Sequence, residues 1–427
     1  MKRLMFLVSL IYGLMALGLG TLNGDELILV TPLVIYLASG LLFGPDALRV
    51  AVTRTISADR TEHDELVSVK LTVTNNGSRL EEVWLEDVVS RPVDIVDGAA
   101  RLLTTLLAGA TTEVAYALRA KRGVYRFPGL RVTAGDHFSL FRRQALVSAP
   151  AQLLVTPGAL RLRRLEIRPR RTRVYSGFVP AHQGGPGVEF FGVRDYQPGD
   201  PLHWINWRAS ARHPDTYYTT EFEQERVADV AIILDARIRS DVLSRHGSLF
   251  ECAAQAAAML AETFLNDGNR VGLLVYGSIL DWTFPGYGKT QRERILQALA
   301  RAEPGGSLIF DKLDVLPSRL FPLHSQIVLI SPLVKDDLPM LVRLRARGYQ
   351  VLIVSPDPIP LEMEMLRATP EADLAARIVR LERRSQISQL RQAGIYVLDW
   401  DINTPLDQAL FAMSNRPLAG PYARGLS

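Results

Sequence analysis

The sequence predicts an α/β protein whose open sheet is preceded by a transmembrane helical hairpin and a small β-sandwich-like domain. Three observations support this fold class: two uncharged apolar runs near the start, period-two alternation in the part that follows, and buried strands alternating with helices near the end. A chain of 427 residues is long enough for two or three domains. The segments that we distinguish are 1–49, 50–157, 158–186, 187–226 and 227–427.

The two apolar runs, 4–20 and 27–44, carry no charge and are near the shortest length that spans a bilayer. Basic residues precede the first run and follow the second, so the positive-inside rule places both ends in the cytoplasm. The expectation is therefore a multi-pass protein of the inner (plasma) membrane with its main domains cytoplasmic. A cleaved signal peptide is the alternative, because Met-Lys-Arg before an apolar run also fits one. The second run and the lack of an Ala-x-Ala site favour the hairpin.

Residues 50–157 show the alternation of half-buried strands. Val67, Val69, Leu71 and Val73 alternate with polar residues, and the run ends in an Asn-Gly turn signal. Further short runs separated by turn residues predict an antiparallel sandwich. Because nothing catalytic stands out in it, we interpret it as a spacer or docking module.

The linker, 158–186, is strongly basic in its first half. Residues 161–173 hold seven arginines and a single glutamate. Such a segment can be held near an anionic lipid surface, or it can be a solvated linker whose arginines pair with acidic side chains. Both interpretations stay open. The second half is rich in Gly and Pro and is typical of a loop.

From residue 227 on, apolar strands alternate with helical patterns, beginning with the run "VADVAIILD". Strands with apolar interiors separated by helices predict an open sheet that is covered on both faces. Residues 301–324 show no period. The single cysteine, Cys252, lies in an alanine-rich helical pattern and is expected to be a small buried side chain.

An acidic row precedes this domain. Glu221, Glu223 and Glu225 recur at every second position, so on a strand they share one face. Like charges in such a row repel unless cations or a metal intervene. Arg194, Arg208 and Arg212 are near in sequence, and we prefer an Arg–Glu network to a metal cluster. Segment 187–226 would then be a ledge that is fixed to the first strand of the α/β domain by aromatic burial and ion pairs.

At these residues the chain resembles a bacterial family known as domain of unknown function fifty-eight. The family's run of Gly, Arg-x-Tyr-x-Pro-Gly-Asp, Ile-x-Trp and Ala-Arg, followed by an acidic strand that ends in Leu-Asp, is present. Its matching residues here are Gly192, Arg194, Tyr196, Pro198, Gly199, Asp200, Ile205, Trp207, Ala211, Arg212 and Asp235, and Arg208 lies within the run.

The resemblance implies an α/β domain of the von Willebrand factor A type. Metal-binding versions carry Asp-x-Ser-x-Ser after the first strand, whereas here Asp235 is followed at those positions by Arg237 and Arg239. The later Asp-Gly corner is replaced by Ser331-Pro332-Leu333. A hard divalent ion needs several oxygen ligands, so metal-dependent adhesion is not expected at this corner, and no cofactor or metal is predicted.

Family members are commonly encoded beside MoxR-type AAA+ ATPases, so the resemblance implies a membrane-anchored, non-enzymatic adaptor. Its expected partners are such an ATPase, other membrane proteins and the lipid bilayer, with anionic lipid at 161–173. Ligands of open α/β sheets bind at the carboxyl ends of the strands, so Asp235, Arg237 and Arg239 are the predicted partner-binding residues. We expect an Arg237→Ala, Arg239→Ala double variant to fold normally and to lose partner capture.

The alternative is a metal-dependent enzyme or an adhesion-type metal-binding domain. It would use Asp200 and His203 as an acid–base pair, or the glutamate row as metal ligands. Asp200 in a Pro-Gly-Asp turn is more simply explained as a residue that accepts backbone N–H groups. Nucleic-acid binding is not expected, because the net charge is only +4 and aromatic residues do not alternate with the linker arginines.

Overall fold

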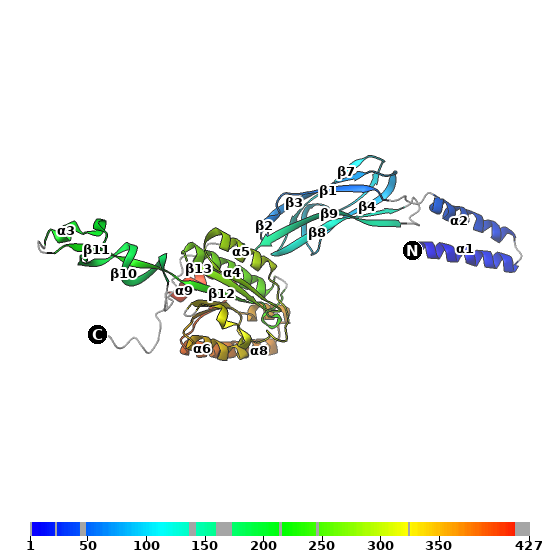
Figure 1. Cartoon of the computed structure of the whole chain (residues 1–427). Coiled ribbons are helices and arrows are strands. Elements are labelled where there is room, and N and C mark those ends of the chain that lie inside the picture. The colour runs from blue at the N-terminus through cyan, green and yellow to red at the C-terminus, as the bar shows by residue number, and fades with distance from the viewer. Residues whose placement is uncertain are drawn as a thin grey trace. The chain divides into compact units, whose positions relative to one another are not determined.

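The structure is a computed structural model that describes residues 2–21, 24–42, 48–135, 142–158, 173–212, 216–244, 247–322 and 325–414. The chain divides into two compact units, Met1–Thr156 and Pro157–Ser427 (Figure 1). Each unit is described by itself.

The N-terminal unit begins with two helices, α1 (Lys2–Thr21) and α2 (Gly24–Leu42). In the described part of the chain, no helix has both the length and the apolar content that a membrane crossing requires. The predicted transmembrane hairpin, and with it the predicted fold class, is therefore wrong. Charged residues at the start of each helix leave uncharged stretches of about 27 Å in α1 and about 24 Å in α2, against a hydrocarbon thickness of ~30 Å. The predicted multi-pass localisation rested on these spans.

The rest of this unit consists of strands in two sheets, with the orders β1-β3-β7-β5 and β2-β9-β8-β4-β6. Their bounds are β1 Val50–Ile56, β2 Arg60–Glu62, β3 Leu66–Asn75, β4 Leu80–Val88, β5 Asp94–Gly98, β6 Arg101–Leu106, β7 Thr111–Arg119, β8 Gly123–Gly135 and β9 Arg142–Thr156. Val67, Val69, Leu71 and Val73 of β3 are at most 1% exposed and lie in a core that both sheets share. The period-two pattern thus gave the buried face of β3 correctly.

The C-terminal unit begins with two strands that form a sheet of their own, β10 (Arg173–Asp195) and β11 (Tyr218–Val227). The connection between them contains a 3₁₀ helix, η1 (Leu202–Trp204), and a short helix, α3 (Trp207–Ser210). The second half of the linker 158–186, which was expected to be a loop, is therefore strand from Arg173 on. The acidic strand β11 is separate from the next strand, because glutamates at every second position do not suit a sheet that is buried on both faces.

The larger part of this unit is a six-stranded sheet with the order β14-β13-β12-β15-β16-β17, in which only β14 is antiparallel to its neighbour. The strands are β12 Asp229–Asp235, β13 Arg270–Tyr276, β14 Leu280–Gly286, β15 Gln326–Ile330, β16 Gln350–Pro356 and β17 Tyr396–Trp400. The helices are α4 Leu249–Asn266, α5 Gly288–Arg301, α6 Leu338–Ala346, α7 Ile359–Met365, α8 Pro370–Gln392 and α9 Leu406–Ser414. The predicted alternation of strands and helices after residue 227 is confirmed by these elements.

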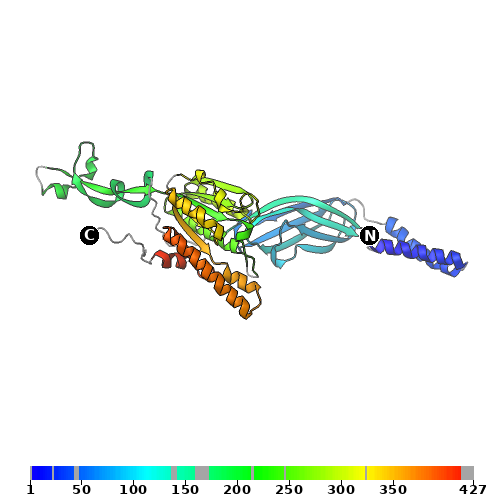
Figure 2. The same cartoon turned by 90° about the horizontal axis from the view of Figure 1, so that it is seen from below.

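Helices cover both faces of this sheet (Figures 1 and 2). Val230, Ile232 and Leu234 of β12 pack in one core with α4, α5 and α9, whereas Ala231 and Ile233 pack in a second core with α6 and α8. Because successive side chains of a strand point to opposite faces, an all-apolar strand is what a sheet between two layers of helices requires. This packing brings the carboxyl ends of β12, β15 and β16 to one edge of the sheet.

Candidate functional site

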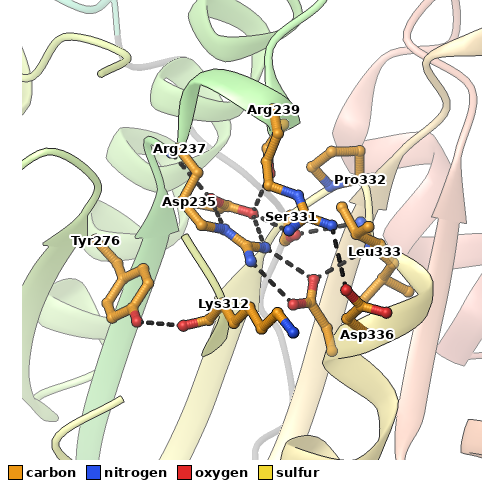
Figure 3. A network of polar contacts seen from close by, with 12 residues as sticks. Asp235, Arg237, Arg239, Tyr276, Lys312, Ser331, Pro332, Leu333 and Asp336 are labelled. Carbon is orange, nitrogen blue, oxygen red and sulfur yellow. Dashed lines mark hydrogen bonds and ion pairs between the residues drawn. The ribbon is translucent and has the colours of Figure 1, made fainter. Parts of the chain in front are cut away.

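A buried arginine occupies the edge of the sheet where β12 ends (Figure 3). The guanidinium of Arg237 donates from Nε and Nη2 to the carboxylate of Asp235, at 2.9 and 2.7 Å. It donates from Nη1 and Nη2 to the carboxylate of Asp337, at 2.9 and 2.8 Å, and from Nη1 to the carbonyl of Asp311 at 3.0 Å. All five N–H groups of a guanidinium are therefore used. We call Asp235, Arg237, Ser331 and Asp337 the Arg237 corner.

The carboxylate of Asp235 is equally well satisfied. Its Oδ2 accepts hydrogen bonds from the hydroxyls of Ser240 and Ser331, both at 2.7 Å, and its Oδ1 accepts one from the backbone N–H of Arg237 at 3.1 Å. Ser331 follows β15, and Asp337 ends the 3₁₀ helix η5 (Lys335–Asp337) just before α6. The corner thus joins the ends of two neighbouring strands to the start of a helix.

Burial strengthens the electrostatic interactions between the charged groups of this corner. Arg237 is 2% exposed, Asp235 is 4% exposed and Asp337 is fully buried. Burial alone would lower the pKa of Arg237, but hydrogen bonds and charge from Asp235 and Asp337 outweigh it and raise that pKa far above its ordinary value. A guanidinium that stays protonated can pair both carboxylates permanently, so the corner has the geometry of an internal ion-pair clamp.

Arg239, two residues further on, lies at the surface. Its guanidinium donates to the carboxylate of Asp311 at 2.9 Å and lies 3.7 Å from the carboxylate of Asp336. The side chain of Arg239 is 26% exposed. Of the three predicted partner-binding residues, the structure therefore places Asp235 and Arg237 in the interior and only Arg239 within reach of a partner. The prediction that these residues bind a partner is not tested by this placement.

Exposed apolar side chains lie next to Arg239. The backbone N–H of Ile238 donates to the carbonyl of Gly305 at 3.0 Å, just before the loop that carries Leu308 and Ile309. Ile238, Leu308 and Ile309 are 58%, 103% and 67% exposed. An open depression of about 420 Å³ is lined by Gly306, Ser307, Leu308 and Asp311. We call Ile238, Arg239, Leu308, Ile309, Asp311 and Asp336 the corner patch.

A second buried arginine, which sequence reasoning missed, holds the next strand ends. Arg383 of α8 is 8% exposed and donates to the carbonyls of Pro332 at 2.7 Å and Ser355 at 3.0 Å, and it pairs with Asp399 at 2.8 Å. These partners follow or end β15, β16 and β17. The available signal was its spacing: Arg383 lies seven residues from both Ala376 and Leu390, which are buried on the same side of the helix.

In the family segment, Arg194 and Asp200 form a two-pronged ion pair with both distances at 2.8 Å. Asp200 also accepts the backbone N–H of Gln197 at 2.9 Å, and Gly199 has a φ of +113°, which favours glycine. The hydrogen bond from Arg194 and then that from Gln197 lower the pKa of Asp200. The described contacts of Asp200 thus fix a turn. His203 is exposed and lies edge-on to Trp204, with 6.0 Å between ring centres.

Among the described side chains, the predicted Arg–Glu network is present at one pair, Arg194 Nε and Glu221 Oε1, which lie 3.7 Å apart. Arg208 and Arg212 are exposed, and neither forms an ion pair with another described residue. Glu223 and Glu225 are placed by their backbones, which pair with Gly184 and Pro180 of β10. Within the described residues, no group of three His, Cys, Asp or Glu side chains could hold a metal.

The segment 187–226 folds back on the acidic strand through β10, which pairs Arg194 with Thr219 and Asp195 with Tyr218. The backbone of Tyr196 donates to Tyr217 at 2.7 Å, and the exposed ring of Trp207 lies edge-on to the ring of Tyr217. The expected ledge is thus a two-stranded ribbon built on β11. Residues 159–172, which include most of the basic stretch 161–173, lie outside the described residues, so the anionic-lipid prediction is untested.

Comparison with known proteins identifies the region that carries these features. Residues 192–368 match the family described as "Protein of unknown function DUF58", which confirms the predicted resemblance. The "Uncharacterized protein YeaD" of Bacillus subtilis (strain 168) is 29% identical over 197 residues, which are 45% of this chain and 47% of that protein. The match thus spans about half the length of this curated relative.

Two of the solved structures that match the chain resemble it only weakly. The CARDB domain of the PF1109 protein from Pyrococcus furiosus has 12% identity and a TM-score of 0.20, covering 25% of this chain and 88% of its own. The cupredoxin domain of amoB from Nitrosocaldus yellowstonii has 10% identity and a TM-score of 0.19, covering 26% and 88%. We draw no conclusion about this chain from likeness at these TM-scores.

Proposed function

Since residues 192–368 match the DUF58 family of unknown function, we propose that the chain is a non-enzymatic interaction protein. Its α/β sheet, which the family resemblance implies to be of the von Willebrand factor A type, would present the corner patch to a partner. The partner that we propose is a MoxR-type AAA+ ATPase, as the family resemblance implies.

The observation that carries this proposal is the pairing of Arg237 with both Asp235 and Asp337. In an open α/β sheet, the carboxyl ends of the strands are where ligands bind. Here the buried carboxylates at that edge are already neutralised from within, so they are not free to hold a substrate or to act as a base. A partner would therefore contact the exposed residues at this edge rather than its buried carboxylates.

That surface has the composition of an interface. Three exposed apolar side chains, Ile238, Leu308 and Ile309, lie beside the charged groups of Arg239, Asp311 and Asp336. Protein interfaces combine an apolar centre with a polar rim, and exposed apolar side chains that gather in one place are typical of binding surfaces. The rigid corner beneath them holds the patch in one shape, which lowers the entropic cost of binding.

The test measures binding of the purified full chain to a purified MoxR-type ATPase, with and without ATP, by biolayer interferometry. A Leu308→Glu, Arg239→Glu double variant is expected to bind at least about tenfold more weakly. The first substitution places a negative charge in the apolar centre of the patch, and the second reverses the sign of the charge at position 239 on its rim. Leu103→Glu, a substitution of a half-exposed leucine in β6 of the other unit, is the control and should bind as the wild type does. A wild-type chain without affinity for the ATPase, or equal binding by all three chains, contradicts the proposal.

A further inference from the structure

Helix α8 has an apolar stripe on its outer side, in addition to the side that packs on the sheet. The helix starts at Thr369, whose hydroxyl accepts the N–H of Ala372, with proline at the next position. Its inward side consists of Ala376, Arg383, Ile387 and Leu390, all at most 8% exposed. Leu374, Ile378 and Leu381 are nonetheless 56%, 50% and 62% exposed. The long orange helix in Figure 2 is α8.

The three exposed residues form one narrow seam. At about 100° per residue they lie within roughly 60° of one another and opposite the buried side. Their spacing of four and then three residues is the d-a-d order of a coiled-coil heptad. A surface helix of a globular domain normally has polar residues on the side away from the core. This seam therefore has the form of a helix–helix contact that lacks its second helix.

The charges beside the seam differ in sign. With Ile378 at position a, Arg377 and Arg384 occupy g positions on one flank, and Glu382 occupies an e position on the other. All three are exposed, and neither Arg377 nor Glu382 forms an ion pair with another described residue. The flanks are thus available to a neighbouring helix.

These charges select the partner. In a parallel pair, a g residue faces the e residue five positions later on the other helix, so Arg377 would face Glu382 of a second copy, twice by symmetry. An antiparallel pair would instead place the g flanks together, arginine against arginine, which is repulsive. A membrane surface fits less well, because α8 has no aromatic residue, whereas helices that lie in the interface usually have them.

From this register we propose that α8 is a self-association surface, on which a second copy of this chain packs its own α8 in parallel across a two-fold axis. The seam is short, so the dimer is expected to be weak, with a dissociation constant on the order of micromolar. The inference stands independently of the corner patch and of the proposed ATPase partner. It implies that each assembly carries the corner patch twice.

Cross-linking of the full chain tests the register. In a Cys252→Ser background, Ser385→Cys places a thiol at the next a position of the seam, where the two copies face each other. Mild oxidation is expected to give a disulfide-linked dimer. Arg380→Cys, which is exposed on the same helix but lies at a c position away from the seam, is the matched control and should form little disulfide-linked dimer. An antiparallel pair would leave Ser385→Cys uncross-linked as well, and that result would overturn the proposal.

Charge exchange tests the specificity. Analytical ultracentrifugation of the full chain should show a dimer that dissociates about tenfold more readily with Arg377→Glu or with Glu382→Arg, because each places like charges together at both symmetric sites. The double exchange should restore the wild-type dissociation constant. Ile378→Lys, an exposed position whose substitution should leave folding unchanged, is expected to give monomer.

Three results would overturn the proposal: a monomeric wild type, a dimer that Ile378→Lys leaves intact, or single exchanges that the double exchange does not rescue. A monomeric chain that binds phosphatidylserine vesicles, and loses that binding with Ile378→Lys, would identify the seam as a lipid-facing surface instead. A monomeric chain that binds another protein through Ile378 would identify a heteromeric contact. Each of these would equally replace the self-association proposal.

Discussion

The guanidinium of Arg237 grips the carboxylate of Asp337, which lies 100 residues further along the chain, through two hydrogen bonds of 2.9 and 2.8 Å. The same guanidinium also donates two hydrogen bonds to the carboxylate of Asp235. An arginine that joins two buried carboxylates fixes the ends of β12 and β15 relative to the start of α6. The shape of the corner patch above it depends on this clamp.

We expect Arg237→Ala to destabilise the α/β unit by about 3–5 kcal/mol, because it leaves two buried carboxylates without their cation. Hydrogen exchange of amides in β12 and β15 measures the free energy of opening. Arg239→Ala, which removes a partly exposed ion pair, is the control and should cost less than about 1 kcal/mol. This expectation corrects the idea that a variant lacking both arginines folds normally. Equal protection in the two variants would show that the clamp contributes nothing.

Arg383→Ala should destabilise the part of the same sheet edge that β16 and β17 form. The substitution removes hydrogen bonds to the carbonyls of Pro332 and Ser355 and the ion pair with Asp399, and we expect a loss of about 2–4 kcal/mol in the stability of β16 and β17. The neighbouring exposed Arg384→Ala should change it by no more than about 0.5 kcal/mol. Urea unfolding of both variants, followed by hydrogen exchange, distinguishes them. A similar loss for Arg384→Ala would mean that helix charge, not the buried contacts, is responsible.

Regular elements of the C-terminal unit were predictable because burial leaves a strong signal in them. An unbroken apolar strand such as β12 is typical of a sheet that lies between two layers of helices, so its sequence predicts that position. The stretch 301–324 gave no signal, because Leu313, Leu316 and Phe321 are isolated anchors in a core and the turns between them follow no period. The apolar runs of α1 and α2 misled the prediction, because each run is near the shortest length that can span a bilayer and was nevertheless interpreted as a complete span.

The site was half predictable. The positions of Asp235, Arg237 and Arg239 after the first buried strand were enough to mark the edge of the sheet. Sequence alone did not reveal that Arg237 is buried, because its partner Asp337 lies in a distant loop and burial of an arginine depends on that partner. Ser331 was interpreted as part of a lost corner, yet its hydroxyl bonds to Asp235 at 2.7 Å. Only the parallel pairing of β12 with β15 brings these groups together.

In the family segment, Asp200 is expected to titrate below its ordinary range. The hydrogen bond from Arg194 and the one from Gln197 lower its pKa in the folded chain, so its contribution to stability is present above about pH 4 and is lost as the pH falls through the lowered pKa. Carbon-13 NMR of labelled aspartate carboxyls measures this titration. Arg194→Ala should raise the pKa towards the ordinary value, whereas Arg208→Ala should leave it unchanged. A pKa that Arg194→Ala does not move would remove the ion pair as the cause.

In the N-terminal unit, Tyr116→Phe tests a buried network between the sheets. The Tyr116 hydroxyl donates to Asp87 at 2.7 Å, and Asp87 also pairs with Arg54. We expect a loss of about 1.5–3 kcal/mol, the range for hydrogen bonds to charged groups. Tyr125→Phe removes the same atom from a bond to the neutral carbonyl of Lys121 and should cost about 0.5–1.5 kcal/mol. Hydrogen exchange in β4 and β7 gives both values, and the reverse order would show that the charge of Asp87 does not strengthen its bond.

The guanidinium of Arg237 lies between two carboxylates that would otherwise need another cation. Removal of its side chain leaves the carboxylates of Asp235 and Asp337 facing each other, with the hydroxyls of Ser240 and Ser331 beside them. Hard divalent ions bind such oxygen groups, so Arg237→Ser, which adds one more hydroxyl, is expected to create a Mg²⁺ site. At 10 mM Mg²⁺ and a dissociation constant of about 1 mM, binding would stabilise the variant by about 1.4 kcal/mol.

Thermal unfolding with and without Mg²⁺ measures this effect, with Arg237→Ser expected to gain stability from the ion and the wild type expected to gain none. An Arg237→Ser, Asp337→Asn double variant is the matched control, since it lacks one of the two carboxylates and should gain much less. The physical reason is charge: two buried carboxylates repel each other at close range, and either a guanidinium or a metal ion can offset that repulsion. A variant indifferent to Mg²⁺ would mean that the corner collapses without Arg237, and an equal gain in the wild type would mean that the ion binds elsewhere.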